Sequence, residues 1–243
     1  MKITIIYGNQ RKGSTYNSVQ LLKEELNRNG TIEYSEVFLP ADLPEFCRGC
    51  FNCRLKGEEH CPDKKQIQPI IAKMLSADGV ILASPVYALD VSAPMKNLLD
   101  HLCYLWLPHR PNKQFFTKTG FVLSTAAGTG TKRTNKTMRL SLDYLGFKRV
   151  YSYGTNVAAS DWSGVSAKKK DKIEADLAKK AAKFYQATLN RKKLSYRLKT
   201  RGIFIMMKKL IKSYDQTNLD RNYWQEQGWF DEISPFRKKE VNE

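Results

Sequence analysis

The sequence predicts a doubly wound α/β domain, in which helices cover both faces of a parallel sheet. Short β-rich runs alternate with helical stretches over the first 190 residues. The run at residues 79–83 is apolar throughout, as expected of a strand that is buried on both faces. Hydrophobic residues make up 42% of the chain and charged residues 27%, which is enough apolar material for a sizeable core. Alternation of this kind favours a doubly wound sheet.

The first half of this domain is expected to hold two strands and two helices. The strands are predicted at residues 2–7 and 31–39, and the helices at residues 16–29 and 67–76. The first helix places Val19, Leu22 and Leu26 on one face, with the spacing that helices show. Gly30 directly after it is a typical helix stop.

The second half is expected to hold three strands, each followed by a helix. The strands are predicted at residues 79–83, 120–124 and 150–157, and the helices at residues 94–105, 135–145 and 166–190. Pro94 suits the first turn of its helix, and Gly146 suits the end of the next one. The alternation stops near Leu194. We therefore predict two parts, a domain over residues 1–190 and a basic helical C-terminal extension over residues 191–243.

The chain is strongly basic, with 41 Lys and Arg against 24 Asp and Glu and a net charge of +17. Basic runs lie at residues 168–170, 191–193 and 237–239. Such charge attracts nucleic acid, anionic membranes or phosphate-bearing ligands, and it also occurs as a solvated helix face. There is no signal-peptide pattern and no apolar run of the roughly 20 residues that a membrane span needs. We expect a cytoplasmic protein.

Three loops at the carboxyl ends of predicted strands have the composition of a nucleotide site, because ligands of doubly wound sheets bind at that edge. Residues 8–17 are rich in glycine, hydroxyls and amides and run into a helix, so free N–H groups can bind an anion there. The spacing fits neither a Walker loop nor a dinucleotide fingerprint and indicates a mononucleotide phosphate, although a plain helix cap looks similar. The candidate cofactor-binding residues of this loop are Asn9, Arg11, Ser14, Thr15, Tyr16 and Asn17, of which the first four are suited to the phosphate.

The other two loops are suited to a planar ligand. Pro85, Val86 and Tyr87 follow the third strand, where proline favours an extended backbone and tyrosine offers a flat face. The loop after the fourth strand is small and flexible, so its backbone can approach a ring closely. Its candidate residues are Thr125, Ala126 and Gly128.

Four of the five cysteines lie within fifteen residues, as Cys47, Cys50, Cys53 and Cys61. In an intracellular chain this spacing indicates metal or redox chemistry before disulfides. One cubane iron–sulfur cluster can be wrapped by thiolates with such spacing. A zinc site, a disulfide and free thiols remain alternatives. Cys103 is expected to be an inert thiol in the core, and His60, His101 and His109 to be surface or packing residues.

These loops together resemble those of the NAD(P)H-dependent FMN reductases, over residues 1–190. Residues 84–87 and 92–100 carry the resemblance most specifically, while Asn9 stands where relatives usually have serine. The resemblance implies a flavodoxin-like sheet with strand order 2-1-3-4-5. It also implies that residues 8–15 hold the FMN phosphate, that residues 85–87 lie along the isoalloxazine and ribityl chain, and that residues 125–130 border the ring.

The cysteine spacing is similar to that of the iron–sulfur flavoproteins, a branch of the same group, which implies a [4Fe-4S] cluster. The expected function is reduction of FMN by NAD(P)H and electron transfer to a small-molecule or protein acceptor. No catalytic side chain is expected, because the flavin carries the redox chemistry. An electron-transfer module reduced by a partner protein is the alternative. A nucleic-acid-binding protein would explain the charge but not the three loops. We expect a homodimer or higher homo-oligomer that the extension helps to hold.

Overall fold

The computed structural model describes residues 1–231 and 235–236, and the basic run at residues 237–239 lies outside them. Parallel strands form the sheet in the order β2-β1-β3-β5-β6, which confirms the predicted order 2-1-3-4-5. A short further strand, β4 (Asp90–Val91), pairs antiparallel with the end of β3. The parallel strands are β1 (Lys2–Tyr7), β2 (Glu33–Phe38), β3 (Gly79–Tyr87), β5 (Thr119–Ala126) and β6 (Arg149–Asn156).

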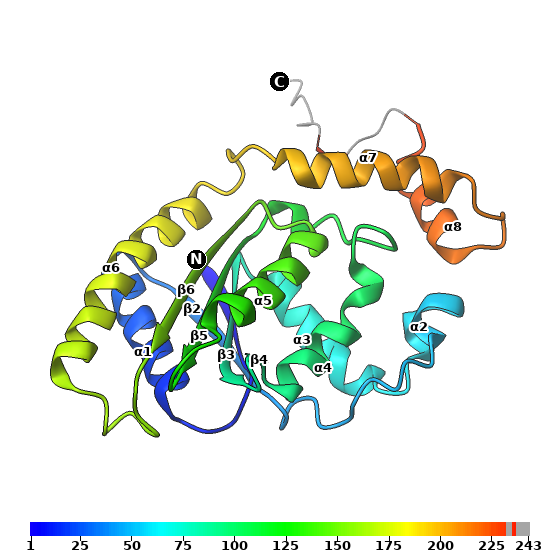
Figure 1. The fold of residues 1–243 in the computed structure, drawn as a ribbon. Helices are drawn as coiled ribbons and strands as arrows, with labels where there is room; N and C mark the ends of the chain where they lie inside the picture. The colour runs from blue at the N-terminus through cyan, green and yellow to red at the C-terminus, as the bar shows by residue number, and fades with distance from the viewer. Residues whose placement is uncertain (232–234, 237–243) are drawn as a thin grey trace.

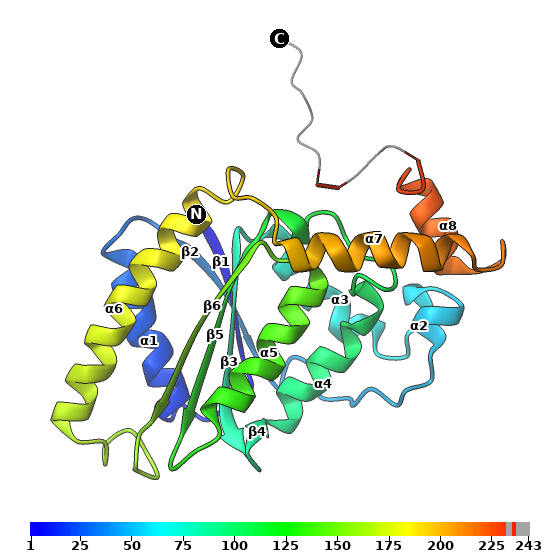
Figure 2. The same ribbon diagram turned by 45° about the horizontal axis from the view of Figure 1, so that its top comes forward.

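Helices cover both faces of this sheet, as Figures 1 and 2 show. On one face lie α1 (Ser14–Asn27) and α6 (Ala167–Leu189). On the other face lie α3 (Lys64–Ser76), α4 (Ala93–His101) and α5 (Thr131–Leu145). Among the described residues, no helix is long and apolar enough to cross a membrane.

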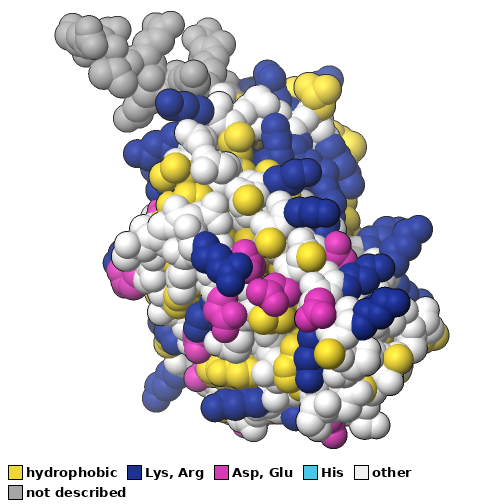
Figure 3. Space-filling view, turned by 90° about the vertical axis from the view of Figure 1, so that its left-hand side faces the viewer, with side chains coloured by type: hydrophobic (Ala, Val, Ile, Leu, Met, Phe, Trp, Pro, Cys, Tyr) yellow, Lys and Arg dark blue, Asp and Glu magenta, His cyan; other side chains and the backbone are white. Residues whose placement is uncertain are grey.

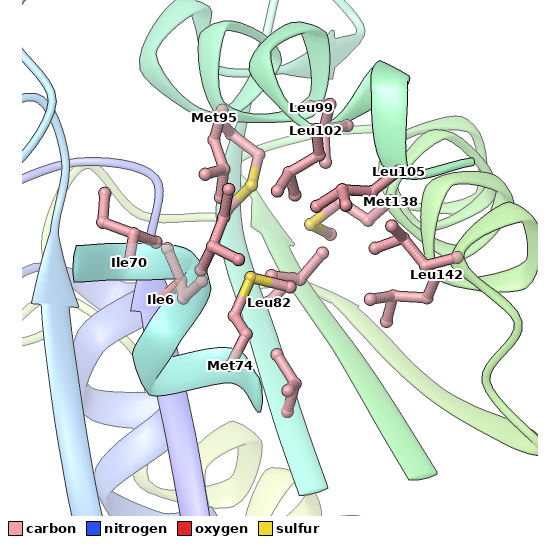
Figure 4. Packing of buried hydrophobic residues seen from close by; sticks show 14 of the residues in the cluster. Ile6, Ile70, Met74, Leu82, Met95, Leu99, Leu102, Leu105, Met138 and Leu142 are labelled. Carbon is pink, nitrogen blue, oxygen red and sulfur yellow. The ribbon is translucent and has the colours of Figure 1, made fainter. Parts of the chain in front are cut away.

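The alternation of side chains along each strand divides the core between the two faces. Ile5 and Ile81 point toward α1 and α6, while Ile6 and Leu82 belong to the opposite cluster. Figure 4 shows that second cluster, where residues of α3, α4 and α5 meet the strands. Because both of its faces are buried, the central strand β3 needs apolar side chains at most positions, which explains the continuous run at residues 79–83.

The structure moves several predicted boundaries. β3 reaches Tyr87 instead of ending at Ala83, because Ser84 and Pro85 continue the pairing with β5 and the next two residues pair with β4. Residues 85–87 therefore form the end of a strand, where a loop was predicted. α1 begins at Ser14 and α5 at Thr131, each earlier than predicted.

The C-terminal extension packs on the rest of the chain. Its helices are α7 (Leu198–Lys212) and α8 (Leu219–Glu226), and α7 runs along one end of the layers from α6 to α8 (Figures 1 and 2). Phe204 and Trp224 of these helices form an apolar cluster with Leu107 and Phe116 of the preceding domain. Trp229 and Phe230 are buried in the same cluster, whereas Ile205 and Met206 of α7 are exposed.

The surface over α1 and α6 carries mixed charge. Figure 3 shows Lys and Arg side chains spread widely across this face, with a group of Asp and Glu side chains among them. For example, Arg28 lies within ion-pair distance of both Glu25 and Glu174. The basic residues of this face are thus interspersed with acidic ones.

Candidate functional site

A cavity of about 170 Å³ lies at the carboxyl ends of β1, β3, β5 and β6. This is the edge of the sheet where doubly wound folds bind their ligands. Residues from all three predicted loops meet in its wall. The predicted residues that line it are Asn9, Arg11, Ser14, Thr15, Pro85, Val86, Tyr87, Thr125 and Ala126.

Gly8 brings the first loop close to the start of α4. Its N–H donates to the carbonyl of Ala83 at 2.7 Å, and its carbonyl accepts from the Ser92 hydroxyl at 2.6 Å. A Cβ atom on Gly8 would lie 2.7 Å from the Ser92 Oγ. Only glycine allows this approach without displacing Ser92, which caps α4.

The start of α1 offers free donors to an anion. Gly13 occupies the cap position, where it makes no side-chain cap hydrogen bond, and the first turn holds no acidic residue. The unpaired N–H groups and the helix dipole both favour a phosphate there. The Arg11 guanidinium lies beside this turn, fixed by a hydrogen bond from Nη2 to the Ser160 carbonyl at 2.9 Å.

A pair of hydroxyls joins two of the loops. Thr15 Oγ1 and Thr125 Oγ1 are 2.7 Å apart and both residues are buried, so each fixes the rotamer of the other. On the opposite side, the Asn9 amide donates to the Tyr87 hydroxyl at 3.3 Å. The Tyr87 ring is half exposed, and it stands at the tight turn into β4, where Ala88 and Leu89 have positive φ. Such strain in non-glycine residues is typical of functional loops.

Three predicted residues lie outside the cavity lining. Tyr16 packs against Tyr7 and Phe38, and the Asn17 amide donates to the Gly13 carbonyl at 2.9 Å, so both support the loop from behind. A Cβ atom on Gly128 would meet nothing within 4 Å, so this glycine stands in open space.

Sequence reasoning missed the part of the wall that follows β6. Val157, Ala159 and Ser160 line the cavity, although only the loops after three of the strands were considered. The signal was available, because the carboxyl end of every parallel strand meets the same edge. Small residues there carry no chemical motif of their own.

A second cavity, of about 280 Å³, is lined by every cysteine of the chain. Cys47 and Cys50 are exposed, whereas Cys53, Cys61 and Cys103 are partly buried. The expectation that Cys103 is a core thiol is therefore wrong. The apolar pattern around Cys103 indicated a helix in the core. In the structure, the turn after α4 faces the cysteine loop, which lies about fifty residues earlier in the sequence.

The buried thiols of this cavity hold their protons firmly. Burial raises the pKa of Cys53 to about 11, and repulsion from the Cys103 and Cys61 sulfurs adds to the rise. Burial also raises the pKa of Cys61 and of Cys103. A bound cation would reverse this preference, because metal ions bind the thiolate and displace its proton.

The spacing of the thiols bears on which metal group would fit. A single zinc ion needs sulfurs about 3.8 Å apart, given Zn–S bonds of about 2.3 Å in a tetrahedron. Among the described residues, no three cysteine sulfurs lie within 4.8 Å of one another. A cubane cluster needs wider spacing, since each thiolate binds a different iron. The four thiols of the motif line one cavity, which is the kind of donor set that a cubane cluster uses.

Helix α4 and the extension hold the cysteine loop in place. The Cys47 N–H donates to the Asn97 side chain at 2.9 Å, and the Asn97 amide donates to the Glu45 carbonyl at 2.8 Å. Arg110 donates to the Cys53 carbonyl and, at 2.6 Å, to the carboxylate of Asp220 at the start of α8. Both ends of this ion pair are buried.

Two of the histidines, His101 and His109, are packing residues, which is one of the two roles expected for them. His101 is buried in the wall of the cysteine cavity, with its ring nitrogens near Asn97 and Asp63. His109 lies 3.0 Å from the carboxylate of Asp220 and so belongs to the contact between the extension and the cysteine loop.

Comparisons with known proteins agree with this arrangement. Residues 1–160 match the sequence pattern of the NADPH-dependent FMN reductase family. An iron–sulfur flavoprotein of Archaeoglobus fulgidus is 28% identical over 237 residues, which cover 94% of this chain and 100% of that protein. An iron–sulfur flavoprotein of Methanosarcina thermophila is 30% identical over 156 residues, or 64% of this chain and 78% of that protein.

Solved structures show the same fold at lower identity. An FMN-dependent NADH-azoreductase from Bacillus anthracis, in complex with FMN, has a TM-score of 0.58 and 12% identity, covering 76% of this chain and 100% of that one. An NADH:FMN oxidoreductase has a TM-score of 0.55 and 19% identity, covering 82% and 93%. The flavodoxin-like arrangement is common to all three chains.

Proposed function

This chain belongs to the NADPH-dependent FMN reductase family and is a flavin oxidoreductase, and we propose that it binds FMN in the cavity at the strand ends. Bound there, FMN would supply the redox chemistry that carries two electrons from NAD(P)H to a small-molecule or protein acceptor. The observation that carries the proposal is the meeting of the three loops in one cavity, with the uncapped start of α1 at one end.

Each part of the wall has a role in this proposal. The phosphate binds the N–H groups at Ser14 and Thr15 and the guanidinium of Arg11, which supplies the opposite charge. Pro85, Val86, Tyr87 and Ala126 would hold the flat ring, as they line the same cavity. Bound FMN supplies the redox chemistry, while the protein binds it, orients it and excludes water from one of its faces.

The cysteine cavity is proposed to hold a [4Fe-4S] cluster through Cys47, Cys50, Cys53 and Cys61. The relatives named as iron–sulfur flavoproteins and the gathering of the four cysteines around one cavity support this assignment. The cluster would exchange single electrons with the flavin. In this proposal the extension over residues 191–243 braces the cysteine loop, and two chains associate as a homodimer.

The proposed reductase activity can be tested on the FMN-loaded protein under anaerobic conditions. Addition of NADPH or NADH should bleach the flavin absorption without any partner protein. A protein that binds FMN but leaves it oxidised with both nucleotides would instead be an electron carrier reduced by a partner. Both nucleotides are needed, since no residue of the described chain has been assigned to the NADPH phosphate.

The proposed cluster has its own test. Anaerobic reconstitution with iron and sulfide should give about four irons and four sulfides per chain. Cys50→Ser should lose most of the iron, while Cys103→Ser, a matched change in the same cavity, should keep it. Background iron in the reconstituted wild type, or equal loss in both variants, would overturn the ligand assignment.

A further inference from the structure

The geometry points to a site for a single divalent transition-metal ion at Cys61, Asp63 and His101, on the wall of the cysteine cavity. Their ligand atoms all lie within 4.8 Å of one another, and they are the group of described residues with this property. The site goes beyond the proposed function. The site shares Cys61 with the proposed cluster, so the ion binds only when the cluster is absent. Asp63 and His101 are not ligands of the proposed cluster.

The two buried members come from different helices. Asp63 is the cap residue of α3, and His101 is the last residue of α4. Their side chains are 7% and 2% exposed, and the His101 Nε2 lies 3.1 Å from the Asp63 Oδ2. Burying two polar side chains this deeply is unfavourable unless each of their lone pairs has a hydrogen-bond donor or a cation as its partner.

The hydrogen bond on the far side of the imidazole decides what Nε2 can do. The His101 Nδ1 lies 3.0 Å from the carbonyl of Asn97. A carbonyl only accepts, so Nδ1 must carry a proton, and in the neutral ring Nε2 then presents a lone pair. The Asp63 carboxylate also presents a lone pair, so the two acceptors face each other and a cation fits between them.

This arrangement is the one that metal-binding histidines usually show. Their second ring nitrogen donates to a backbone carbonyl or a carboxylate, which fixes the tautomer and aims the other nitrogen at the metal. The Asn97 carbonyl has that position here. This hydrogen bond is a second observation, independent of the spacing of the three ligand atoms, and it also points to a metal ion.

The chemistry of the donors selects the kind of ion. One sulfur, one imidazole nitrogen and one carboxylate oxygen suit Zn²⁺, Fe²⁺ or Co²⁺ better than Mg²⁺ or Ca²⁺, which prefer oxygen alone. Three protein ligands leave a fourth tetrahedral position for water. When the ion binds, the Cys61 thiol gives up its proton to solvent and a metal–sulfur bond forms.

Co²⁺ is the probe for the test, since its thiolate bonds absorb visibly while Zn²⁺ is silent. The background is the double variant Cys47→Ser, Cys50→Ser, which removes two exposed thiols and with them the cluster and any four-sulfur site. In this background the apo-protein should bind about one Co²⁺ per chain with one thiolate charge-transfer band. The FMN site is untouched, so FMN binding shows that the variant is folded.

Histidine and aspartate substitutions then separate the outcomes. In that background His101→Gln should weaken Co²⁺ binding by about 100-fold or more, since loss of even an outer partner costs about 10- to 100-fold. Asp63→Asn keeps the side-chain shape and should also weaken it. His60→Gln, an exposed histidine next to Cys61, is the matched control and should change nothing.

Two results would overturn the site. One is no Co²⁺ binding in the folded background variant, which would mean that a proton joins the buried pair as an imidazolium and a carboxylate. The other is binding that His101→Gln and Asp63→Asn leave unchanged. Neither result bears on the proposed reductase, which is tested by flavin bleaching in the wild type.

Discussion

The charge of Arg11 is held at the phosphate end of the strand-end cavity by its bond to Ser160. Arg11→Ala should weaken FMN binding by about 1–3 kcal/mol, the usual scale of a charge-assisted hydrogen bond. The control is Lys12→Ala, which removes the neighbouring exposed charge outside the cavity lining. Fluorescence titration of FMN measures both affinities. Equal losses would mean that general surface charge, and no specific phosphate contact, attracts the cofactor.

The buried Lys118 leads to a prediction of how the free energy of unfolding depends on pH. It is buried between the end of α3 and β5, where its ammonium donates to the carbonyls of Leu75 and Ala77, and burial lowers its pKa to about 8. The unfolded chain keeps the ordinary value near 10.5. Between these two values the unfolded state binds more protons than the folded state, so the free energy of unfolding rises with pH.

Comparison with Lys118→Met isolates this effect from other titrating groups. The unfolding free energy of the wild type minus that of the variant should rise by on the order of 2–3 kcal/mol from about pH 7.5 to 10.5. Denaturant unfolding at a series of pH values measures it. A difference that stays flat or falls over this window would show that the folded chain holds the Lys118 proton as firmly as the unfolded chain does.

The ion pair between Arg110 and Asp220 joins the segment after α4 to α8, and Arg110 also donates to the Cys53 carbonyl of the cysteine loop. Asp220 also accepts from His109 and lies 3.9 Å from Arg54, so one buried carboxylate faces several cationic or polar groups. Asp220→Asn should cost about 3–5 kcal/mol of unfolding free energy, because it leaves a buried guanidinium without its counter-charge. It should also lower the iron content after reconstitution.

Glu226→Gln is the control for that prediction, as an exposed acidic residue on the same helix. Thermal unfolding and iron analysis of the two variants give the comparison. If Asp220→Asn loses stability but keeps full iron content, the extension stabilises the fold without positioning the cysteine loop. If neither the stability nor the iron content changes, the Arg110–Asp220 ion pair is important for neither of them.

The elements that the sequence predicts correctly are those with a local signal. The strands follow from apolar runs, which any strand buried on both faces requires, whereas the strand order is implied by the resemblance to the FMN reductases. The loop before α1 has a local signal too, glycine and hydroxyls before a helix, and its binding of a phosphate stays a prediction. Contacts between distant residues have no such signal: Arg110 meets Asp220 across 110 positions, and His101 meets Asp63 across 38. The prediction ended β3 too early because Pro85 suggested a loop. Proline lacks an N–H donor, but its carbonyl can still accept a hydrogen bond from a neighbouring strand at a strand end.

At the scale of the whole molecule, α4 connects the two cavities. Its cap residue Ser92 bonds to Gly8 beside the strand-end cavity, and its last residue, His101, lines the cysteine cavity. Nine helical residues at a rise of 1.5 Å span about 13 Å. A single helix thus runs from the neighbourhood of the proposed flavin site to the proposed cluster site.

The most direct test of the account is a fluorescence titration that compares FMN with riboflavin, which lacks the phosphate. If the start of α1 and Arg11 bind the phosphate, FMN should bind at micromolar concentration or below, and riboflavin about 100-fold more weakly or worse. Equal affinity for the two flavins would contradict the assignment of residues 8–15 to the phosphate. Failure of both to bind would contradict the flavin site itself.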